Sequence, residues 1–206
     1  ATTALGAGEF DLAERLAERA VEAAGDPPPL DALEVLAQVS WLGVGTGASP
    51  ADVLGAGGDP ERLQIAATRL EQLAEDPAFA ATAPDPERAE TYSRLAVVMA
   101  LLGDADSAAR WKTRQLEAVQ PPETDSPNTL RIRLELVALL QAAGRLDEAA
   151  TLNGHLIETL EETYGADDPR LSLPLQRQYE LLSELGRKKE AKAVKKRLRQ
   201  FEKGRR

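Results

Sequence analysis

The chain contains the stretch SPNTLRIRLELVALLQAAGRLDEAA (residues 126–150) and, 42 positions later, a second version of it, DPRLSLPLQRQYELLSELGRKKEAK (residues 168–192). In each copy a proline opens a helical pattern that runs to a glycine, Gly144 or Gly186, and a second helical pattern follows directly. A unit of this kind cannot bury its own apolar face, so it is stable only when it stacks on its neighbours. The repeat therefore predicts an all-α fold of stacked helix pairs.

The turn of this repeat recurs along much of the chain. A glycine is followed five residues later by an alanine at four places: Gly8 and Ala13, Gly103 and Ala108, Gly144 and Ala149, and Gly186 and Ala191. Glycine permits the left-handed backbone conformation that turns one helix into the next. Alanine removes side-chain bulk where two helices cross. We therefore expect antiparallel helix–turn–helix pairs.

Apolar residues at spacings of three and four predict the individual helices. The first is expected at Phe10–Ala24, with Leu12, Leu16, Ala20 and Val21 as its apolar face. The others are expected at Ala32–Leu42 after a capping Asp31, 60–75, Asp85–Gly103, 105–119, Pro127–Ala143, Leu146–Tyr164, Pro169–Leu185 and from Arg187 to about Phe201. Residues 78–84 are expected to form a connector. Pro174 is expected to kink or delay the helix that Pro169 begins.

Composition supports a helical protein and excludes several kinds of site. The 206 residues are 43% hydrophobic but only 4% aromatic, so the core must consist mainly of Leu, Val and Ala. Cysteine is absent, which excludes disulfides and thiolate metal sites. No run of about 18 apolar residues is present, so we expect a soluble domain, cytoplasmic or periplasmic. Because a helix pattern begins close to Ala1, we also expect that the sequence belongs to a larger chain.

These patterns resemble the tetratricopeptide repeat, in the 42-residue variety familiar from kinesin light chains and bacterial signalling proteins. The resemblance rests on Pro127, Leu136, Leu140, Gly144, Leu146, Glu148, Ala149, Leu152, Leu156, Tyr164, Gly165, Asp168, Pro169, Leu182, Gly186, Glu190 and Ala191. It implies antiparallel helix pairs stacked as a right-handed α-solenoid. Residues 85–206 are expected to form three repeats, including a basic C-terminal capping helix. Residues 1–84 are expected to form degenerate repeats with a Gly-rich insertion at 43–58.

The resemblance also implies a function. Proteins of this family are scaffolds whose first helices line a concave groove that receives a peptide or a partner protein. Groove residues are expected on the first helices, off the leucine stripe, at Arg94, Val97, Arg131, Glu135, Ala138, Gln141, Arg177 and Glu180. The asparagine pairs that the family often carries there are missing, so charged or mixed recognition is predicted. The alternative for each of these side chains is an ordinary solvated helix face.

Charge is unevenly distributed along the sequence. Residues 1–186 contain 14 basic and 32 acidic side chains, a net charge of −18, whereas residues 187–206 contain 11 basic and two acidic ones, a net charge of +9. In the last helix Ala191, Val194, Leu198 and Phe201 are expected inside and Lys188, Lys192, Lys195, Lys196 and Arg199 outside. The basic face has two interpretations, a soluble capping helix or a patch for nucleic acid, anionic lipid or an acidic partner. The first is preferred because the tail lacks aromatic residues that could stack on bases.

The remaining signals do not indicate an active site. The insertion at 43–58 lacks the preceding strand and the lysine of a phosphate-binding loop. An alternative hypothesis is nevertheless a helical sensor domain in which this insertion closes over a small ligand. His155 is the only histidine, with Glu158 and Glu162 nearby, and one imidazole is a poor basis for a metal site. No catalytic residue, metal ligand or cofactor is predicted.

Overall fold

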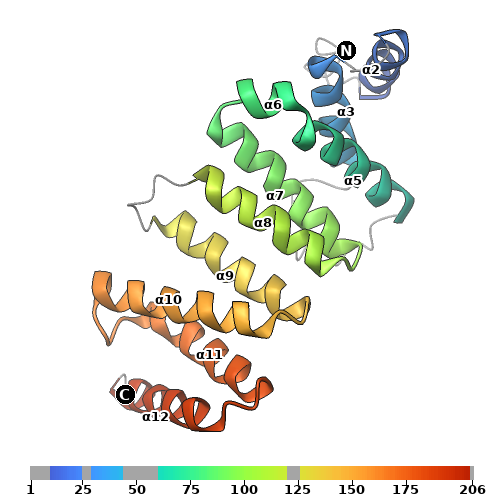
Figure 1. Ribbon diagram of the computed structural model, residues 1–206. Helices are drawn as coiled ribbons and strands as arrows, with labels where there is room; N and C mark the ends of the chain where they lie inside the picture. The colour runs from blue at the N-terminus through green and yellow to red at the C-terminus, as the bar shows by residue number, and fades with distance from the viewer. Residues whose placement is uncertain (1–9, 25–28, 44–59, 120–125, 205–206) are drawn as a thin grey trace. The chain divides into compact units, whose positions relative to one another are not determined.

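A computed structural model describes residues 10–24, 29–43, 60–119 and 126–204 (Figure 1). The described residues form α-helices and one 3-10 turn, and no strand occurs among them. The elements are α2 (Phe10–Ala24), α3 (Leu30–Gly43), α5 (Pro60–Glu75), α6 (Pro77–Thr82), α7 (Asp85–Leu101), α8 (Ala105–Val119), α9 (Pro127–Ala142), α10 (Leu146–Tyr164), η1 (Pro169–Leu171), α11 (Ser172–Glu184) and α12 (Lys188–Gly204). The predicted all-α class is confirmed.

The chain divides into two compact units, residues 1–118 and 119–206. The sequence-based division after residue 84 has a different criterion, the regularity of the repeats instead of compactness, and it stays a prediction. The Gly-rich insertion lies outside the described residues from position 44 to 58. Each unit is considered below by itself.

In the first unit α2 packs on α3, and α3 and α7 pack on α5. The bounds predicted for α2 are confirmed, but its predicted apolar face is wrong in part. Leu12 and Leu16 are 39% and 40% exposed, whereas Ala13 and Ala17 are fully buried. Ala20 and Val21 pack at the edge of the same cluster. Ala13 and Ala17 occupy the buried face because their short side chains let two helices approach closely.

Two other predictions for the first unit are corrected. Helix α3 begins at Leu30, so Asp31 lies in its first turn instead of capping it. The expected connector 78–84 contains α6, whose N-terminus is capped by Asp76 through hydrogen bonds from the amides of Ala78 and Phe79. Phe79 is completely buried, which fixes this short helix against the unit.

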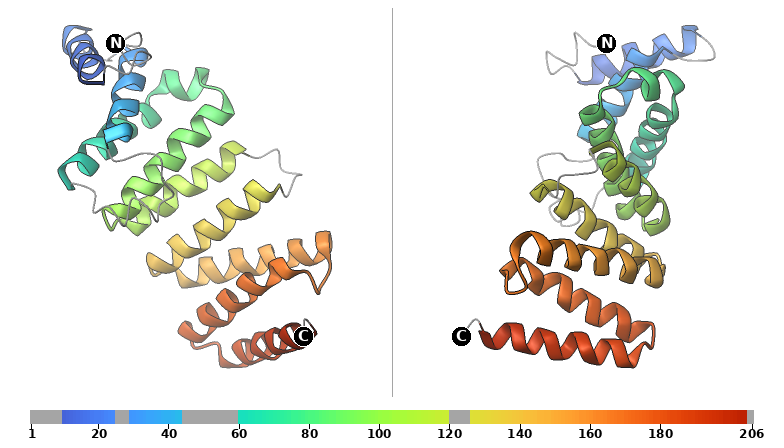
Figure 2. Two further views of the ribbon diagram at one scale, coloured as in Figure 1. Left: turned by 180° about the vertical axis from the view of Figure 1, so that it is seen from behind. Right: turned by 60° about the vertical axis from the view of Figure 1, so that its left-hand side comes forward.

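The second unit contains both copies of the repeat, residues 126–150 and 168–192. Helices α9 to α12 run in alternating directions, which both views of Figure 2 show. The two turns have the same geometry: Gly144 and Gly186 have φ of +74° and +69°, and the following arginine amides donate to Leu140 and Leu182 oxygens at 2.9 Å in both copies. The expected role of glycine at these turns is confirmed.

Two prolines set the start of α11. Asp168 caps the 3-10 turn η1 by accepting from the Arg170 amide at 2.9 Å. The α-helix itself begins only at Ser172, with Pro174 in its first turn. The predicted delay is therefore confirmed. The core beneath consists of Leu130, Leu156, Ile157, Leu160, Leu171 and Leu175, with Leu134, Tyr164, Val194 and Leu198 packed against it.

Candidate functional site

The predicted residues on α9 lie off its buried face. Arg131 is exposed, and Glu135, Ala138 and Gln141 are half-buried. The Arg131 guanidinium donates to Glu135 Oε1 at 2.5 Å and to Asn128 Oδ1 at 2.9 Å. Helix α9 thus presents a row of polar side chains along one side, while Leu136 and Leu140 face the core.

The predicted residues on α11 come together with those on α9 through one amide. The Gln141 Nε2 donates to Glu184 Oε1 at 2.7 Å, and the Arg177 Nη1 donates to Gln141 Oε1 at 3.2 Å. Glu180 accepts from Gln176 Nε2 at 3.1 Å on the same helix. One side chain near the end of α9 therefore bonds to two side chains of α11, and this contact joins the polar sides of the two first helices.

We call this surface the α9–α11 face; it comprises Asn128, Arg131, Glu135, Ala138, Gln141, Leu173, Gln176, Arg177, Glu180 and Glu184. Sequence reasoning missed four of these: Asn128, Leu173, Gln176 and Glu184. Leu173 is the notable one because it is 53% exposed, more than any other large apolar side chain of the described chain. Its position one turn before Arg177 is the signal that could have found it.

The two remaining predicted residues, Arg94 and Val97, belong to the first unit. Both lie on α7 and are half-buried. Arg94 forms an ion pair with Glu90 one turn earlier. The order of the charges is therefore acid then base on α7, whereas it is base then acid at Arg131 and Glu135 on α9.

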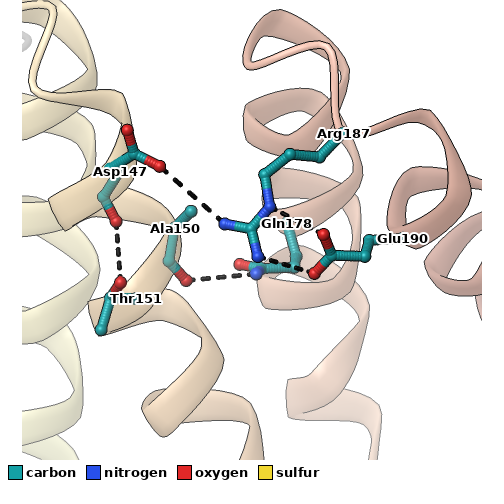
Figure 3. A network of polar contacts seen from close by, with 6 residues as sticks. All are labelled: Asp147, Ala150, Thr151, Gln178, Arg187 and Glu190. Carbon is teal, nitrogen blue, oxygen red and sulfur yellow. Dashed lines mark hydrogen bonds and ion pairs between the residues drawn. The ribbon is translucent and has the colours of Figure 1, made fainter.

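The opposite side of α11 is fixed to α10 by a buried pair of amides. Asn153 is completely buried, and its Nδ2 donates to Pro174 O at 2.9 Å and to Gln178 Oε1 at 2.7 Å. Gln178 in turn donates to Ala150 O at 3.1 Å, the contact drawn in Figure 3. Figure 3 also shows Arg187, in the turn before α12, between Glu190 of α12 and Asp147 of α10. These contacts hold the helix that carries Arg177.

Helix α12 follows the predicted pattern on its inner side. Ala191 is buried, and Val194 and Leu198 pack against the core of the unit. The side chain of Phe201 lies outside the described residues. The residues predicted on its outer side are exposed: Lys188, Lys192, Lys195, Lys196 and Arg199. Lys195 also contacts Tyr179, its Nζ donating to the hydroxyl at 3.2 Å.

The sequence offered two further candidates, His155 and the Gly-rich insertion at 43–58. His155 is 72% exposed, and its Nδ1 is 3.3 Å from Glu158 Oε2. Within the described residues no three His, Asp or Glu side chains form a group that could hold a metal ion. In the same residues no helix is long and apolar enough to cross a membrane. The insertion proposed to close over a small ligand lies almost entirely at positions that the structure does not describe.

Helix pairs that recur at a fixed spacing and turn at left-handed glycines define a tetratricopeptide-like helical-repeat fold. No protein-family model matches the sequence, and no curated protein matches it. Solved structures do. A protein of Podospora anserina described as a kinesin light chain with nearly identical TPR-like repeats is similar with a TM-score of 0.58 and 20% identity, over 94% of this chain and 95% of that one.

Two further structures show the same fold. MamA is similar with a TM-score of 0.51 and 16% identity, over 98% of this chain and 94% of its own. BtubC (BKLC) from P. vanneervenii is similar with a TM-score of 0.51 and 16% identity, over 95% of this chain and 91% of its own. At these identities the likeness establishes the TPR-like fold, and function has to be argued from this chain's own surface.

Proposed function

We propose that the protein is a non-enzymatic scaffold that binds a peptide or a segment of a partner protein on the α9–α11 face. The observation that carries the proposal is the Gln141 amide, which joins Arg177 and Glu184 of α11 to α9. Side chains from two helices thereby form one surface of defined geometry. The fold supports the proposal, because helical-repeat proteins of this kind commonly serve as interaction scaffolds.

The composition of the face suits recognition of a polar partner with some apolar contact. Arg131 and Glu135 pair within one helix at an exposed position, where an ion pair contributes little and can be exchanged for a partner's charge. Complementary charges at an interface fix register and exclude wrong partners more than they add affinity. Ala138, about one turn after Glu135, is small and half-buried, so a backbone can approach there.

Leu173 adds an apolar contact to the same face. An isolated exposed leucine is ordinary on a protein surface. Here it lies one turn before Arg177 on α11, so a partner could cover the leucine side chain while its carboxylate meets the guanidinium. We extend the same role, as a proposal, to Arg94 and Val97 on α7 in the first unit.

Site-specific photo-crosslinking tests this function. p-Benzoylphenylalanine is introduced at Ala138 on the face and, as a matched control, at His155 on the exposed side of α10. In an extract of the source organism we expect a crosslinked protein from Ala138 and none from His155. Equal crosslinking from both positions would mean that the face is not selective.

Charge reversal tests the same face without a probe. The double variant Arg131→Glu/Arg177→Glu should lose recovery of the partner captured at Ala138, and Arg94→Glu should weaken it if the first unit contributes. Arg131 is exposed and Arg177 and Arg94 are half-buried, and none of the three lies in the core, so the helical circular dichroism spectrum should be unchanged. Unchanged recovery by the double variant would count against the face.

A further inference from the structure

Two sets of basic side chains can be distinguished in α12 and at the Arg187 that precedes it, and the first set contacts other residues of the protein. Arg187 forms a bidentate pair with Glu190, with N–O distances of 2.8 and 2.7 Å. Arg197 pairs with Glu161 of α10. Lys195 contacts the ring and the hydroxyl of Tyr179. These three cations connect α12 to α10 and α11 or stabilise its first turn.

The second set forms what we call the basic stripe: Lys189, Lys192, Lys196 and Arg199. All four are exposed, and their spacings of three, four and three residues place them on one side of an α-helix. Of the nearby carboxylates whose side chains the structure describes, Glu190 pairs with Arg187 and Glu184 accepts from Gln141. Within the described chain, then, the stripe is an uncompensated row of positive charge.

The stripe acts by charge and not by membrane insertion. An interfacial helix needs a free apolar side to enter the lipid boundary. The apolar side of α12 is already occupied, because Ala191 is buried and Val194 and Leu198 pack against the core leucines. What remains for a partner is the ammonium and guanidinium groups with their aliphatic stems.

The surroundings of the stripe favour a narrow acidic ligand over nucleic acid. Residues 126–186 carry five basic and ten acidic side chains, a net charge of −5, so a broad polyanion would meet repulsion beside α12. Residues 187–199 contain no aromatic side chain on which a base could stack. Three of the four stripe residues are lysines, whereas the planar fork of arginine is the better phosphate ligand.

We infer that the basic stripe binds a short acidic segment of a partner protein, at a second surface separate from the α9–α11 face. From Lys189 to Arg199 an α-helix rises by about 15 Å. An extended chain covers this distance with about five residues at roughly 3.3 Å each. Because alternate side chains of an extended chain face the same side, a run of about five Asp or Glu residues turns two or three carboxylates toward the four cations.

Fluorescence anisotropy of the full chain with a labelled peptide of about eight consecutive glutamates, which when extended is longer than the stripe, tests this inference. We expect binding at about 50 mM salt that weakens steeply towards about 200 mM, because exposed charges are screened. Reversal of three charges, Lys189→Glu/Lys192→Glu/Lys196→Glu, should weaken binding at least about tenfold. The neutral version, with glutamine at the same three positions, should give a smaller loss and guards against misfolding.

The controls separate this surface from the proposed function. Arg131→Glu/Arg177→Glu on the α9–α11 face should bind the glutamate peptide as the unaltered chain does. Loss of binding in this variant, or unchanged binding in the stripe variant, would overturn the inference. The inference would also be overturned if single-stranded DNA of equal charge, or phosphatidylserine vesicles, bound more tightly than the glutamate peptide and the stripe variant abolished that binding.

Discussion

Helices α10 and α12 occupy the same place in consecutive repeats, yet one is an interior element and the other a surface. Ala149 and Ala191, 42 positions apart, are both buried at the helix crossing. Helix α10 packs against both α9 and α11, whereas α12, among the described residues, packs mainly on α11. The equivalent residues one turn later differ accordingly: Asn153 is completely buried and Lys195 is exposed.

The difference shows how packing against a second helix changes the side chains that the same sequence pattern must carry. A buried polar side chain costs free energy unless it is hydrogen-bonded. The Nδ2 of Asn153 meets this requirement by donating to Pro174 and Gln178, while its buried Oδ1 has no hydrogen-bond partner among the described residues. With no helix of the described chain over its outer side, α12 can carry lysines there at little cost. One repeat pattern thus produces a packed junction in one copy and a charged surface in the other.

The largest expected effect separates these two positions directly. Asn153→Ala should destabilise the protein by about 2–3 kcal/mol, because it removes two hydrogen bonds and leaves a small cavity at a buried site. Lys195→Ala at the equivalent exposed position should change the unfolding free energy by less than about 0.5 kcal/mol. Urea unfolding of both variants measures the difference. Equal effects would mean that the two junctions are packed alike.

Asn153 also shows where sequence reasoning stops. The helix bounds of α2, α5, α10 and their neighbours follow from apolar spacing, capping residues and the glycine turns. The role of Asn153 does not, although it stands four residues after Ala149 on the buried side. A pattern places it on that side but cannot identify its partners, because Pro174 and Gln178 meet it only in the folded unit.

The face of α2 was missed for a different reason. Hydrophobicity favours Leu12 and Leu16 as the buried pair, yet the fold buries Ala13 and Ala17. The pairing of Gly8 with an alanine five residues later had already indicated Ala13 as a position where two helices cross closely. Of the candidate site, the sequence predicted the polar side chains of α9 and α11, but not the bridge through Gln141, which depends on how the two helices pair.

The turns should respond equally in both copies. Gly144→Ala and Gly186→Ala should each cost about 1 kcal/mol, because alanine is strained at positive φ. An added Cβ would meet nothing within 4 Å at either glycine, so backbone strain alone decides the effect. Gly154→Ala, inside α10, should instead stabilise by up to about 1 kcal/mol. Thermal unfolding of the three variants distinguishes a turn effect from a packing effect.

A smaller effect concerns the arginines that follow these turns. The hydrogen bond from Arg145 lowers the pKa of Glu148, and that from Arg187 lowers the pKa of Glu190. A carboxyl whose pKa is lowered in the folded state stabilises the fold at pH values above the ordinary pKa of glutamate. This contribution is lost as pH falls through the folded pKa. Arg145→Ala and Arg187→Ala should each raise the pKa of the partner carboxyl in an NMR titration, with little change in stability at neutral pH.

Removal of the Arg187 side chain should have one further effect. Arg187 also lies 3.9 Å from Asp147 of α10, so it connects the two second helices. Amide exchange at the start of α10 should therefore increase slightly in Arg187→Ala at low salt. Unchanged exchange in this variant would indicate that the contact with Asp147 is screened by solvent.

The smallest effect decides to which set of cations Lys195 belongs. Its hydrogen bond and its charge lower the pKa of the Tyr179 hydroxyl, and a further hydrogen bond with Ser183 acts in the same direction. Because the folded pKa is lowered, this contribution to stability is present only at alkaline pH and is lost as pH falls through it. Lys195→Ala should raise the pKa of Tyr179, measured from tyrosinate absorbance with Tyr179→Phe to assign the signal. An unchanged pKa would mean that Lys195 is fully solvated and available to an acidic partner, and Lys195→Glu should then weaken binding of the glutamate peptide as reversal of the stripe lysines does.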